Sequence, residues 1–548
     1  MSIIPASRKP PEDGICSRAK SAGTRILLAA AMIVATATAM SADLTADGER
    51  LYREHCATCH SLNLRGSAHG STLRGEAFLS KWRDQDAMSL VAFQRANMPP
   101  GSPGLVSDGQ QARIASYIIA SNRDPSATGA LFTSAAKLAA LGDGDIDKVG
   151  WEAWGGAATI DEAARSRGGF TNREVEGFSA VSAESLQSPP AEDWLSWRRS
   201  LDGQAYSPLR QVNRETVKNL RLAWVLTMAA GNNQATPLVH NGIMYLTHPG
   251  NIVQALDAAS GELIWEYRHQ FPEAARTLGG PTRNIAIYGD KIYMATYDAA
   301  IVAIDARTGR EVWRTAKANF KQGYTHTAGP IIGDGVVISG INGCEWYKKE
   351  GCFITGHDAD TGKELWRTST IALPGMDGGD SWAGLPTEMR AGGDTWIAGS
   401  YDPKLKLFFI GTSQPKPWVA ASRGMTPGDA ALYTNSTLAL RPDTGELVWY
   451  FQHIPGETID MEVGFERVLV DIDGTPLVVT VGKDGLLWKL NRATGEYIGV
   501  VETLPQTIYA KVDKVKGKVT YRDDILNARV GDTIHACPGI YGGHNWQA

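Results

Sequence analysis

From about residue 190 onward, apolar residues occur in short runs separated by turns rich in aspartate and glycine. In one recurring pattern, an apolar residue and an aspartate end a run, Ser/Thr-Gly makes a turn, and a glutamate, two apolar residues and a tryptophan begin the next run. This predicts two antiparallel strands joined by a tight turn, with the tryptophan docked on a neighbouring unit. The copies are ALDAASGELIW ending at Trp265, AIDARTGREVW at Trp313, GHDADTGKELW at Trp366, ALRPDTGELVW at Trp449 and the degenerate KLNRATGEYIG through Gly499.

The turn glycines of these copies are spaced by 48, 53, 83 and 50 residues. A spacing near 50 is typical of the four-stranded blades of a β-propeller. The one long interval predicts a large insertion. We therefore predict an all-β propeller over residues 191–548, with an opening strand near Trp224. The composition agrees, because 59 glycines and 16 tryptophans are many for 548 residues.

Residues 1–42 have the pattern of an export signal. A run of apolar and small residues extends from Ile26 to Ala39, and five basic residues precede it: Arg8, Lys9, Arg18, Lys20 and Arg25. This predicts a signal peptide and a periplasmic protein. The alternative is a membrane anchor, but the run is shorter than the ~20 apolar residues of a span, and no later segment is long enough. The net charge of −5 argues against nucleic-acid binding.

A CxxCH motif follows in the stretch CATCHSLN, with Cys56, Cys59 and His60. Two cysteines at this spacing serve in zinc sites, in redox disulfides and in haem attachment. Zinc would need a second ligand pair, which is not nearby, and a thioredoxin-type pair would need a βαβ setting that this helical pattern does not offer. The motif therefore predicts one covalent haem c, with His60 as the proximal iron ligand.

The sixth iron ligand is predicted in the segment NMPPGSPGLVSDGQQARIASYIIASN. Met98 precedes a proline pair that would hold the loop extended, and Ser107 is the expected cap of a helix ending near Ala120. Met88 and His69 are alternatives, although Met88 lies in an apparent helix, where methionine more often packs in a core. Residues 43–125 resemble a small all-α class I cytochrome c domain, and residues 126–190 are predicted to be a linker.

The repeats, together with DWLSWRRSLDGQAYSPLRQVN and LALRPDTGELVWYFQH, resemble the quinoprotein alcohol dehydrogenases of the methanol and ethanol dehydrogenase family. The resemblance covers about residues 185–548. It implies an eight-bladed propeller that holds pyrroloquinoline quinone (PQQ) and a metal ion, Ca²⁺ or a lanthanide. With the cytochrome domain the chain is similar to a quinohaemoprotein, and the haem-first order is similar to that of polyvinyl alcohol dehydrogenases.

The same resemblance implies the site residues. Trp396 in GGDTW is the expected floor beneath PQQ, and Glu345 in NGCEW and Gln414 in GTSQPKPW are expected metal ligands. Asp460, which follows WYFQHIPGETI, is expected to be both a metal ligand and the catalytic base. The other implied PQQ contacts are Gln234, Arg283, Thr327, Lys483, Asn545 and Trp546.

Several positions depart from the family pattern. Gln234 replaces a glutamate, Gln414 replaces an asparagine, and the pair of adjacent cysteines that caps PQQ in the family is absent. Cys344 and Cys352 are predicted to form a disulfide that stiffens the hairpin beside Glu345. The extra carboxylate of Glu462 would favour a trivalent lanthanide over calcium if it faces the metal, and the alternative is a solvated loop acid.

These features predict a dehydrogenase that moves hydride from an alcohol to PQQ, with electrons leaving through the haem to an external acceptor such as a cytochrome c or a respiratory-chain component. Two alternatives stay open. The same cofactors could hydroxylate a heterocycle, or the propeller could be a scaffold without catalysis. The chain ends at GGHNWQA with five recognisable repeats. We therefore expect a truncated ring, which would leave Cys537 unpaired; the alternative is a ring that closes with a partner.

Overall fold

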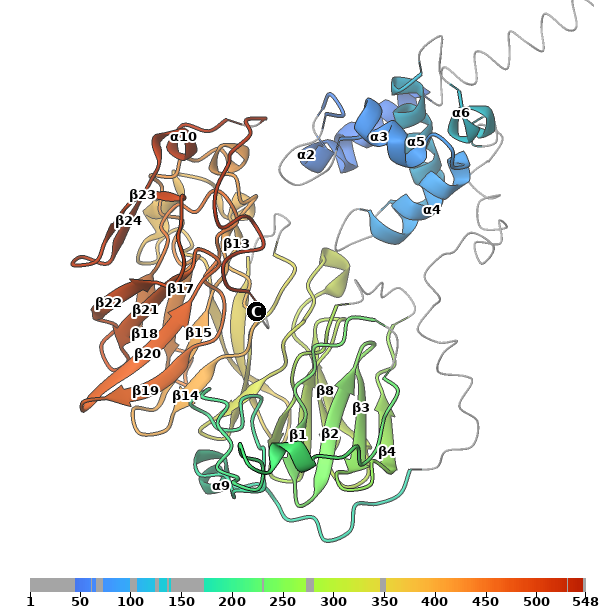
Figure 1. Ribbon diagram of the computed structural model, residues 1–548. Coiled ribbons are helices and arrows are strands. Elements are labelled where there is room, and N and C mark those ends of the chain that lie inside the picture. Colours follow the sequence, from blue (N-terminus) through green and yellow to red (C-terminus); the bar gives the residue numbers. More distant parts are fainter. Residues whose placement is uncertain are drawn as a thin grey trace, which may run out of the picture. The chain divides into compact units, whose positions relative to one another are not determined.

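The computed structural model describes residues 45–60, 62–65, 72–98, 106–123, 128–135, 138, 172–228, 231–272, 280–344, 351–529 and 531–545. Two compact units are present (Figure 1). The first contains residues 1–66, 71–95 and 106–156, and the second contains the rest. The predicted signal peptide lies outside the described residues, and the predicted domain boundaries stay predictions. None of the helices in the described ranges is both long and apolar enough to span a bilayer.

The first unit is helical, as predicted for the cytochrome region. Residues 45–55 are helical, and they are followed by α2 (Ala57–His60), α3 (Glu76–Trp82), α4 (Ala87–Asn97), α5 (Asp108–Ser121) and α6 (Ala130–Ser134). Ser107 caps α5 through a capping box with Gln110, which confirms the predicted start. Gly48 allows the first helix to approach α5 closely, because a Cβ there would lie 2.2 Å from the carbonyl oxygen of Arg113. Met88 is buried in the core, so it occupies a packing position.

The second unit is built from antiparallel sheets. Its described part contains five four-stranded sheets in sequential strand order. The strands are β1 (Leu238–His240), β2 (Ile243–His248), β3 (Ile252–Asp257) and β4 (Leu263–Arg268); β5 (Ala286–Tyr288), β6 (Lys291–Ala295), β7 (Ala300–Asp305) and β8 (Glu311–Ala316); β9 (Ile331–Gly333), β10 (Val336–Ser339), β11 (Phe353–Asp358) and β12 (Glu364–Ser369); β14 (Ser400–Asp402), β15 (Leu407–Gly411), β17 (Ser436–Leu440) and β18 (Leu447–Gln452); and β19 (Val468–Ile472), β20 (Thr475–Val481), β21 (Leu486–Asn491) and β22 (Tyr497–Glu502).

These sheets are arranged as propeller blades. The first strands of successive sheets contact one another in turn, β5 with β9, β9 with β14 and β14 with β19. A further hairpin, β23 (Tyr509–Asp513) with β24 (Lys518–Tyr521), follows the fifth blade. Residues 172–190, in the predicted linker, include Val175, Val181 and Leu186, which are buried in the main core of this unit. The predicted propeller fold is confirmed, and its total of eight blades stays a prediction.

The repeated tryptophan joins each blade to the next, as predicted. Trp265 of β4 lies over Gly309, the turn glycine between β7 and β8, and its Nε1 donates a hydrogen bond to the carbonyl of Ala306 at 3.0 Å. The same arrangement recurs for Trp224 over Gly261, Trp313 over Gly362, Trp366 over Gly445 and Trp449 over Gly495. In the degenerate fifth copy, Tyr497 takes the place of the tryptophan over Gly517.

The predicted opening strand near Trp224 is wrong. Residues 220–228 form no strand, although the Trp224 indole occupies the docking position. A strand needs a neighbour for its backbone hydrogen bonds, and none of the described residues pairs with this segment. The side chains of Leu222 and Val225 are accordingly 79% and 75% exposed.

The predicted insertion is confirmed, partly before and partly within the fourth blade. One excursion, between β12 and β14, contains η5 (Gly379–Trp382), η6 (Thr387–Met389) and β13 (Ala391–Gly392), and another, between β15 and β17, contains β16 (Pro415–Lys416) and η7 (Ala420–Arg423). β13 and β16 pair, so the two excursions are joined. They carry Trp396 and Gln414, which places both predicted site residues on one supported structure.

The tryptophan contact can be tested with two glycine variants of similar backbone geometry. Gly309 and Gly242 have φ of +70° and +76°, but a Cβ at Gly309 would lie 2.7 Å from the Trp265 ring, whereas one at Gly242 would meet nothing within 4 Å. We expect G242A to lower the free energy of unfolding by about 1–2 kcal/mol and G309A to lower it by a further ~1–3 kcal/mol through overpacking. Chemical denaturation followed by circular dichroism measures both, and equal losses would contradict the prediction.

Candidate active site

Three segments bring charged and polar side chains together near Asp460. Asp460 lies between β18 and β19 in a left-handed backbone conformation with φ of +67°. Gln414 Nε2 donates a hydrogen bond to Asp460 Oδ1, and Lys483 Nζ donates one to Asp460 Oδ2 at 3.1 Å. Lys483 also pairs with Glu462 Oε1 at 3.0 Å. All four side chains are largely buried, so the two carboxylates share one cation away from bulk water.

Trp396 lies directly beside this cluster. Its Nε1 donates a hydrogen bond to Glu462 Oε2 at 3.1 Å. The Arg283 guanidinium lies 4.8 Å from the centre of its ring, and Phe465 packs edge-on against it at 5.4 Å. The predicted floor residue is therefore held by an acid, a cation and an aromatic ring.

Arg283, which precedes β5 of the second blade, connects the network to Thr327, which precedes β9 of the third blade. Its Nη1 donates a hydrogen bond to the carbonyl of Thr327 at 3.2 Å, and the backbone N–H of Thr327 donates one to Asn342 Oδ1 at 3.3 Å. The backbone N–H of Thr236 donates a hydrogen bond to the carbonyl of Arg283, which connects the segment of Gln234 to the same group. The structure thus brings most of the predicted PQQ contacts into one connected region, and their roles stay predictions.

Other predicted residues are placed less completely. Glu345 and Trp546 lie outside the described residues. The half-buried Asn545 donates a hydrogen bond from Nδ2 to the carbonyl of Tyr541, while Gly543 donates one to the carbonyl of Lys483. The end of the described chain therefore lies beside the cluster.

The haem motif belongs to the helical unit. His60 ends α2 and is 7% exposed, and its backbone N–H donates a hydrogen bond to the carbonyl of Cys56. Met98 directly follows α4 and is half-buried. The side chain of Cys59 and the alternative ligand His69 lie outside the described residues. The ligand assignments stay predictions.

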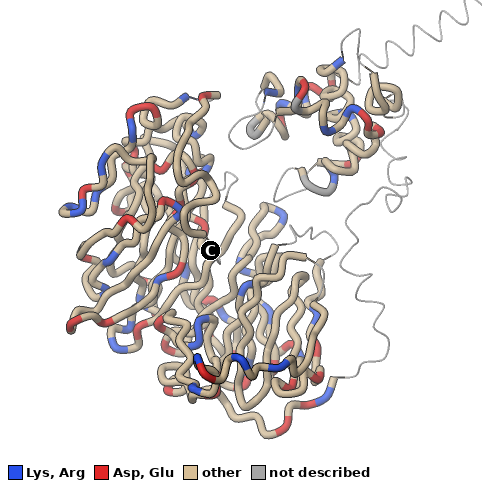
Figure 2. The backbone as a smooth tube through the Cα atoms, in the orientation of Figure 1, with Lys and Arg blue, Asp and Glu red and all other residues tan. Residues whose placement is uncertain are grey.

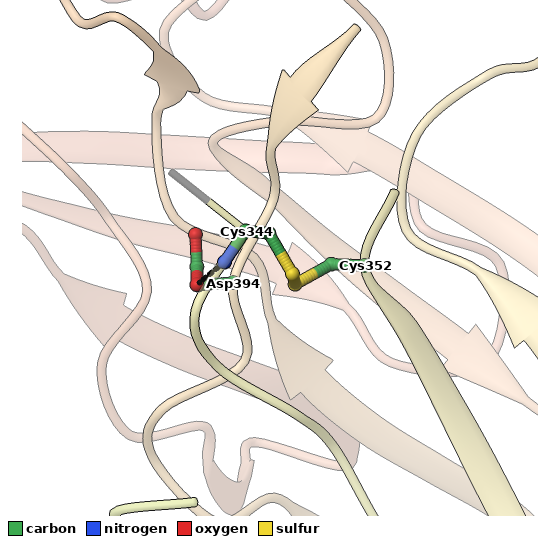
Figure 3. A group of neighbouring side chains, drawn as sticks. All are labelled: Cys344, Cys352 and Asp394. Atoms are coloured by element: carbon green, nitrogen blue, oxygen red, sulfur yellow. Dashed lines mark hydrogen bonds between the residues drawn. A yellow bond between two sulfur atoms is a disulfide. The ribbon is translucent and has the colours of Figure 1, made fainter. Parts of the chain in front are cut away.

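The predicted disulfide between Cys344 and Cys352 is confirmed, with the two Cα atoms 5.6 Å apart (Figure 3). The backbone N–H of Cys344 donates a hydrogen bond to Asp394 Oδ1 at 3.1 Å, and its carbonyl accepts one from Gly392. These bonds tie the disulfide to the segment that carries Trp396. Nothing in the sequence pattern pointed to Asp394. Cys537 is exposed and forms no disulfide within the described part of the chain.

Burial sets the electrostatics of the cluster. Burial and the neighbouring Glu462 raise the pKa of Asp460. For Lys483 burial acts in the opposite direction, but the two carboxylates outweigh it and raise its pKa. Burial lowers the pKa of Arg283 to about 10. Away from this cluster, acidic and basic residues are interspersed over each unit (Figure 2).

The oxygen atoms of the cluster suit a hard cation and a polar ligand. Gln414 Oε1 is buried and has no hydrogen-bond partner among the described residues, and the same is true of Gln234 Oε1. Buried polar atoms normally have a partner, so each of these oxygens is available to accept a hydrogen bond from a bound group or to bind a cation. With the carboxylate of Asp460, Gln414 supplies the oxygen ligands that Ca²⁺ and similar ions prefer.

Comparison with known proteins identifies the class. Residues 194–514 match the family described as the glucose/ethanol/alcohol dehydrogenase β-propeller domain, and residues 43–118 match the family described as cytochrome c oxidase, cbb3-type, subunit III. The chain therefore belongs to the glucose/ethanol/alcohol dehydrogenase β-propeller family, as the sequence predicted.

The individual relatives include quinohemoprotein alcohol dehydrogenases and a methanol dehydrogenase. Quinohemoprotein alcohol dehydrogenase ADH-IIG of Pseudomonas putida is 34% identical over 68% of this chain and 54% of its own. The solved structure of ADHIIG from P. putida HK5 has a TM-score of 0.60 at 31% identity, covering 67% of this chain and 57% of that one. A europium-containing methanol dehydrogenase has a TM-score of 0.59 at 26% identity, and the match covers 66% of this chain and 68% of that one. The chain spans about half the length of the curated quinohemoprotein relatives it matches.

A buried carboxyl next to the cluster gives a pH test of the fold. Asp484 accepts hydrogen bonds from the backbone of Leu486 and from the hydroxyl of Tyr509, and burial raises its pKa to about 7. Because the folded state binds this proton more tightly than the unfolded state does, stability should fall as pH rises from about 4 to 7. We expect D484N to flatten this dependence by on the order of 3 kcal/mol between pH 5 and 8 in urea denaturation. The same dependence of the unfolding free energy on pH in D484N and in the wild type would contradict the prediction.

Proposed function

We propose that the protein is a PQQ-dependent alcohol dehydrogenase with a covalent haem c as its electron outlet. The observation that carries the proposal is the convergence of Asp460, Gln414, Lys483 and Trp396 at the positions expected for a metal, a base and a quinone floor. The names of the relatives, quinohemoprotein alcohol dehydrogenases, support it. A scaffold without catalysis would not need two carboxylates and a lysine buried together beside a tryptophan.

In this proposal, Asp460, Gln414 and Glu345 hold the metal ion. The bound groups supply hydride acceptance, by PQQ, and Lewis-acid polarisation, by the metal. Asp460 takes the proton from the alcohol oxygen as general base. Lys483 orients the Asp460 carboxylate through the 3.1 Å hydrogen bond and compensates the charge of both acids. Burial of the cluster excludes water from the reacting alcohol.

The remaining predicted residues bind and orient PQQ. Trp396 is the floor, and its bond to Glu462 and its packing against Arg283 and Phe465 keep the ring in one orientation. Direct polar contacts come from Gln234, Arg283, Thr327, Lys483 and Asn545, with Trp546 beside them. The unpartnered, buried oxygen of Gln234 supports its place in this set.

The metal is Ca²⁺ or a trivalent lanthanide. Glu462 lies beside Asp460 through the shared Lys483, so it is not a solvated loop acid. Its extra negative charge at the site favours the trivalent ion if Lys483 releases it on metal binding. The similarity to a europium-containing methanol dehydrogenase supports the trivalent lanthanide.

We further propose that the protein works in the periplasm, where covalent haem and the Cys344–Cys352 disulfide are stable. Its partners are an alcohol substrate and an external electron acceptor such as a cytochrome c. A panel that includes heterocyclic substrates separates alcohol oxidation from hydroxylation.

The function is tested with the purified full-length protein, a dye acceptor and a panel of alcohols, with and without PQQ and Ca²⁺ or La³⁺. We expect oxidation that requires PQQ and metal, and a fall in kcat of at least about 100-fold in D460N, because the base is lost. D473N is the matched control, since Asp473 also has a positive φ but lies in the hairpin between β19 and β20. Oxidation that is independent of PQQ, or that survives in D460N, would contradict the proposal.

The haem ligand is tested with two methionine variants. We expect M98A to lower the haem midpoint potential by about 0.1 V or more, because methionine ligation raises it, and to let added imidazole bind the ferric iron. M88A removes a methionine that is 5% exposed in the core, so it should lower the melting temperature of the helical unit and leave the potential unchanged. A potential shift in M88A alone would assign the ligand to Met88.

A further inference from the structure

Glu457 lies three residues before Asp460 and has a completely buried side chain. Its Oε1 accepts hydrogen bonds from the backbone N–H groups of Ile459 at 2.6 Å and Met461 at 2.9 Å. These are the residues immediately before and after Asp460. One carboxylate oxygen therefore binds the backbone on both sides of the proposed base.

This arrangement explains how Asp460 keeps its unusual backbone. Its φ of +67° is in the left-handed region, which residues other than glycine adopt rarely and mostly when local hydrogen bonds favour it. The segment from residue 453 to 467 contains no helix or strand, so its backbone N–H groups need acceptors other than those of a helix or a sheet. Glu457 supplies that partner for two of them.

Arg423, the last residue of η7, joins this turn to the segment of Gln414. Its Nη2 donates a hydrogen bond to the carbonyl of Glu457 at 2.7 Å, and its Nη1 donates to the carbonyls of Pro417 and Trp418 at 2.9 and 3.0 Å. The backbone N–H of Ala420 adds a bond to Thr458 Oγ1 at 2.9 Å. These hydrogen bonds thus connect the segment that carries Gln414 with the segment that carries Asp460.

We propose that Glu457 is the positioning residue for Asp460, and that Arg423 keeps the Gln414 segment in register with it. Glu457 touches none of the reacting groups, and it acts by holding the left-handed turn that points the Asp460 carboxylate at Gln414 and Lys483. The proposal rests on the proposed function for its effect on catalysis. The hydrogen bonds themselves can be tested without that function.

The test compares E457Q, which keeps an oxygen acceptor at the same reach, with E457A, which removes it. Displacing a catalytic group by about 1 Å can cost on the order of 100-fold in rate. We expect E457A to lower kcat of the PQQ- and metal-loaded protein by about 10- to 100-fold, with KM changed less than about threefold, and E457Q to restore kcat to within about threefold of the wild type.

The control is D402A, which removes another buried carboxylate, one at the end of β14 that pairs at 2.6 Å with Arg492 of the following blade. Both alanine variants should lower the melting temperature, but only E457A should lower kcat when measured well below that temperature. If E457A does not fold, E457D takes its place, because it keeps a carboxyl group and cannot span both N–H groups. An unchanged kcat in folded E457A or E457D, or no rescue by E457Q, would overturn the proposal.

Hydrogen exchange measured by mass spectrometry provides a readout that is independent of activity. A peptide covering residues 458–462 should exchange at least about tenfold faster in E457A than in the wild type, E457Q or D402A, because the N–H groups of Ile459 and Met461 lose their acceptor. Absence of PQQ-dependent oxidation in the wild type would refute the proposed function, and unchanged exchange in E457A would separately refute the role of Glu457.

Discussion

The docking of one tryptophan per blade on the turn glycine of the next is the contact on which the β-rich unit depends. The indole needs a flat surface, and the glycine provides one, since a Cβ at these positions would lie between 2.3 and 2.7 Å from the ring. The ring N–H is satisfied at the same time by a carbonyl beside the turn. Burial of apolar area and a saved hydrogen bond thus coincide in a single residue.

Because this contact fixes the outer edges of the blades, the loops near their inner strands can differ without loss of the fold. Two long excursions use this freedom, one between the third and fourth blades and one within the fourth, and they pair through β13 and β16. In the third blade the disulfide closes the loop from Cys344 to Cys352, and the hydrogen bonds of Cys344 with Asp394 and Gly392 attach that loop to the first excursion. Precise placement of site residues requires a rigid scaffold whose loops are held by covalent and hydrogen bonds.

Charge balance is the second constraint on the site. Two buried carboxylates beside one another would repel, and each would lose its hydration. Lys483 bonds both Asp460 and Glu462, and the Trp396 N–H satisfies a further oxygen of Glu462. Trp396, the proposed quinone floor, is therefore also part of the electrostatic support of the proposed base. A metal ion bound by Asp460 would have to compete with Lys483 for both acids.

Local sequence patterns determined much of this protein by themselves. The repeats predicted the blades, their tight turns and the docking tryptophans, because turn glycines and strand periodicity act over a few residues. The capped helix at Ser107, the family and the pairing of Cys344 with Cys352 could also be predicted, since each follows from a short motif or from positions that match a known pattern.

Only the tertiary structure decided the rest. The prediction of an opening strand near Trp224 was wrong, because a strand depends on a neighbouring strand that the local sequence does not reveal. The bond from Trp396 to Glu462 and the bond from Arg423 to the carbonyl of Glu457 join residues that are far apart in the chain. Even Glu457, three residues from Asp460, was overlooked, because its contribution depends on the direction of its side chain in a turn without regular structure. Such contacts are set by how separate loops pack, and no short-range pattern encodes that packing.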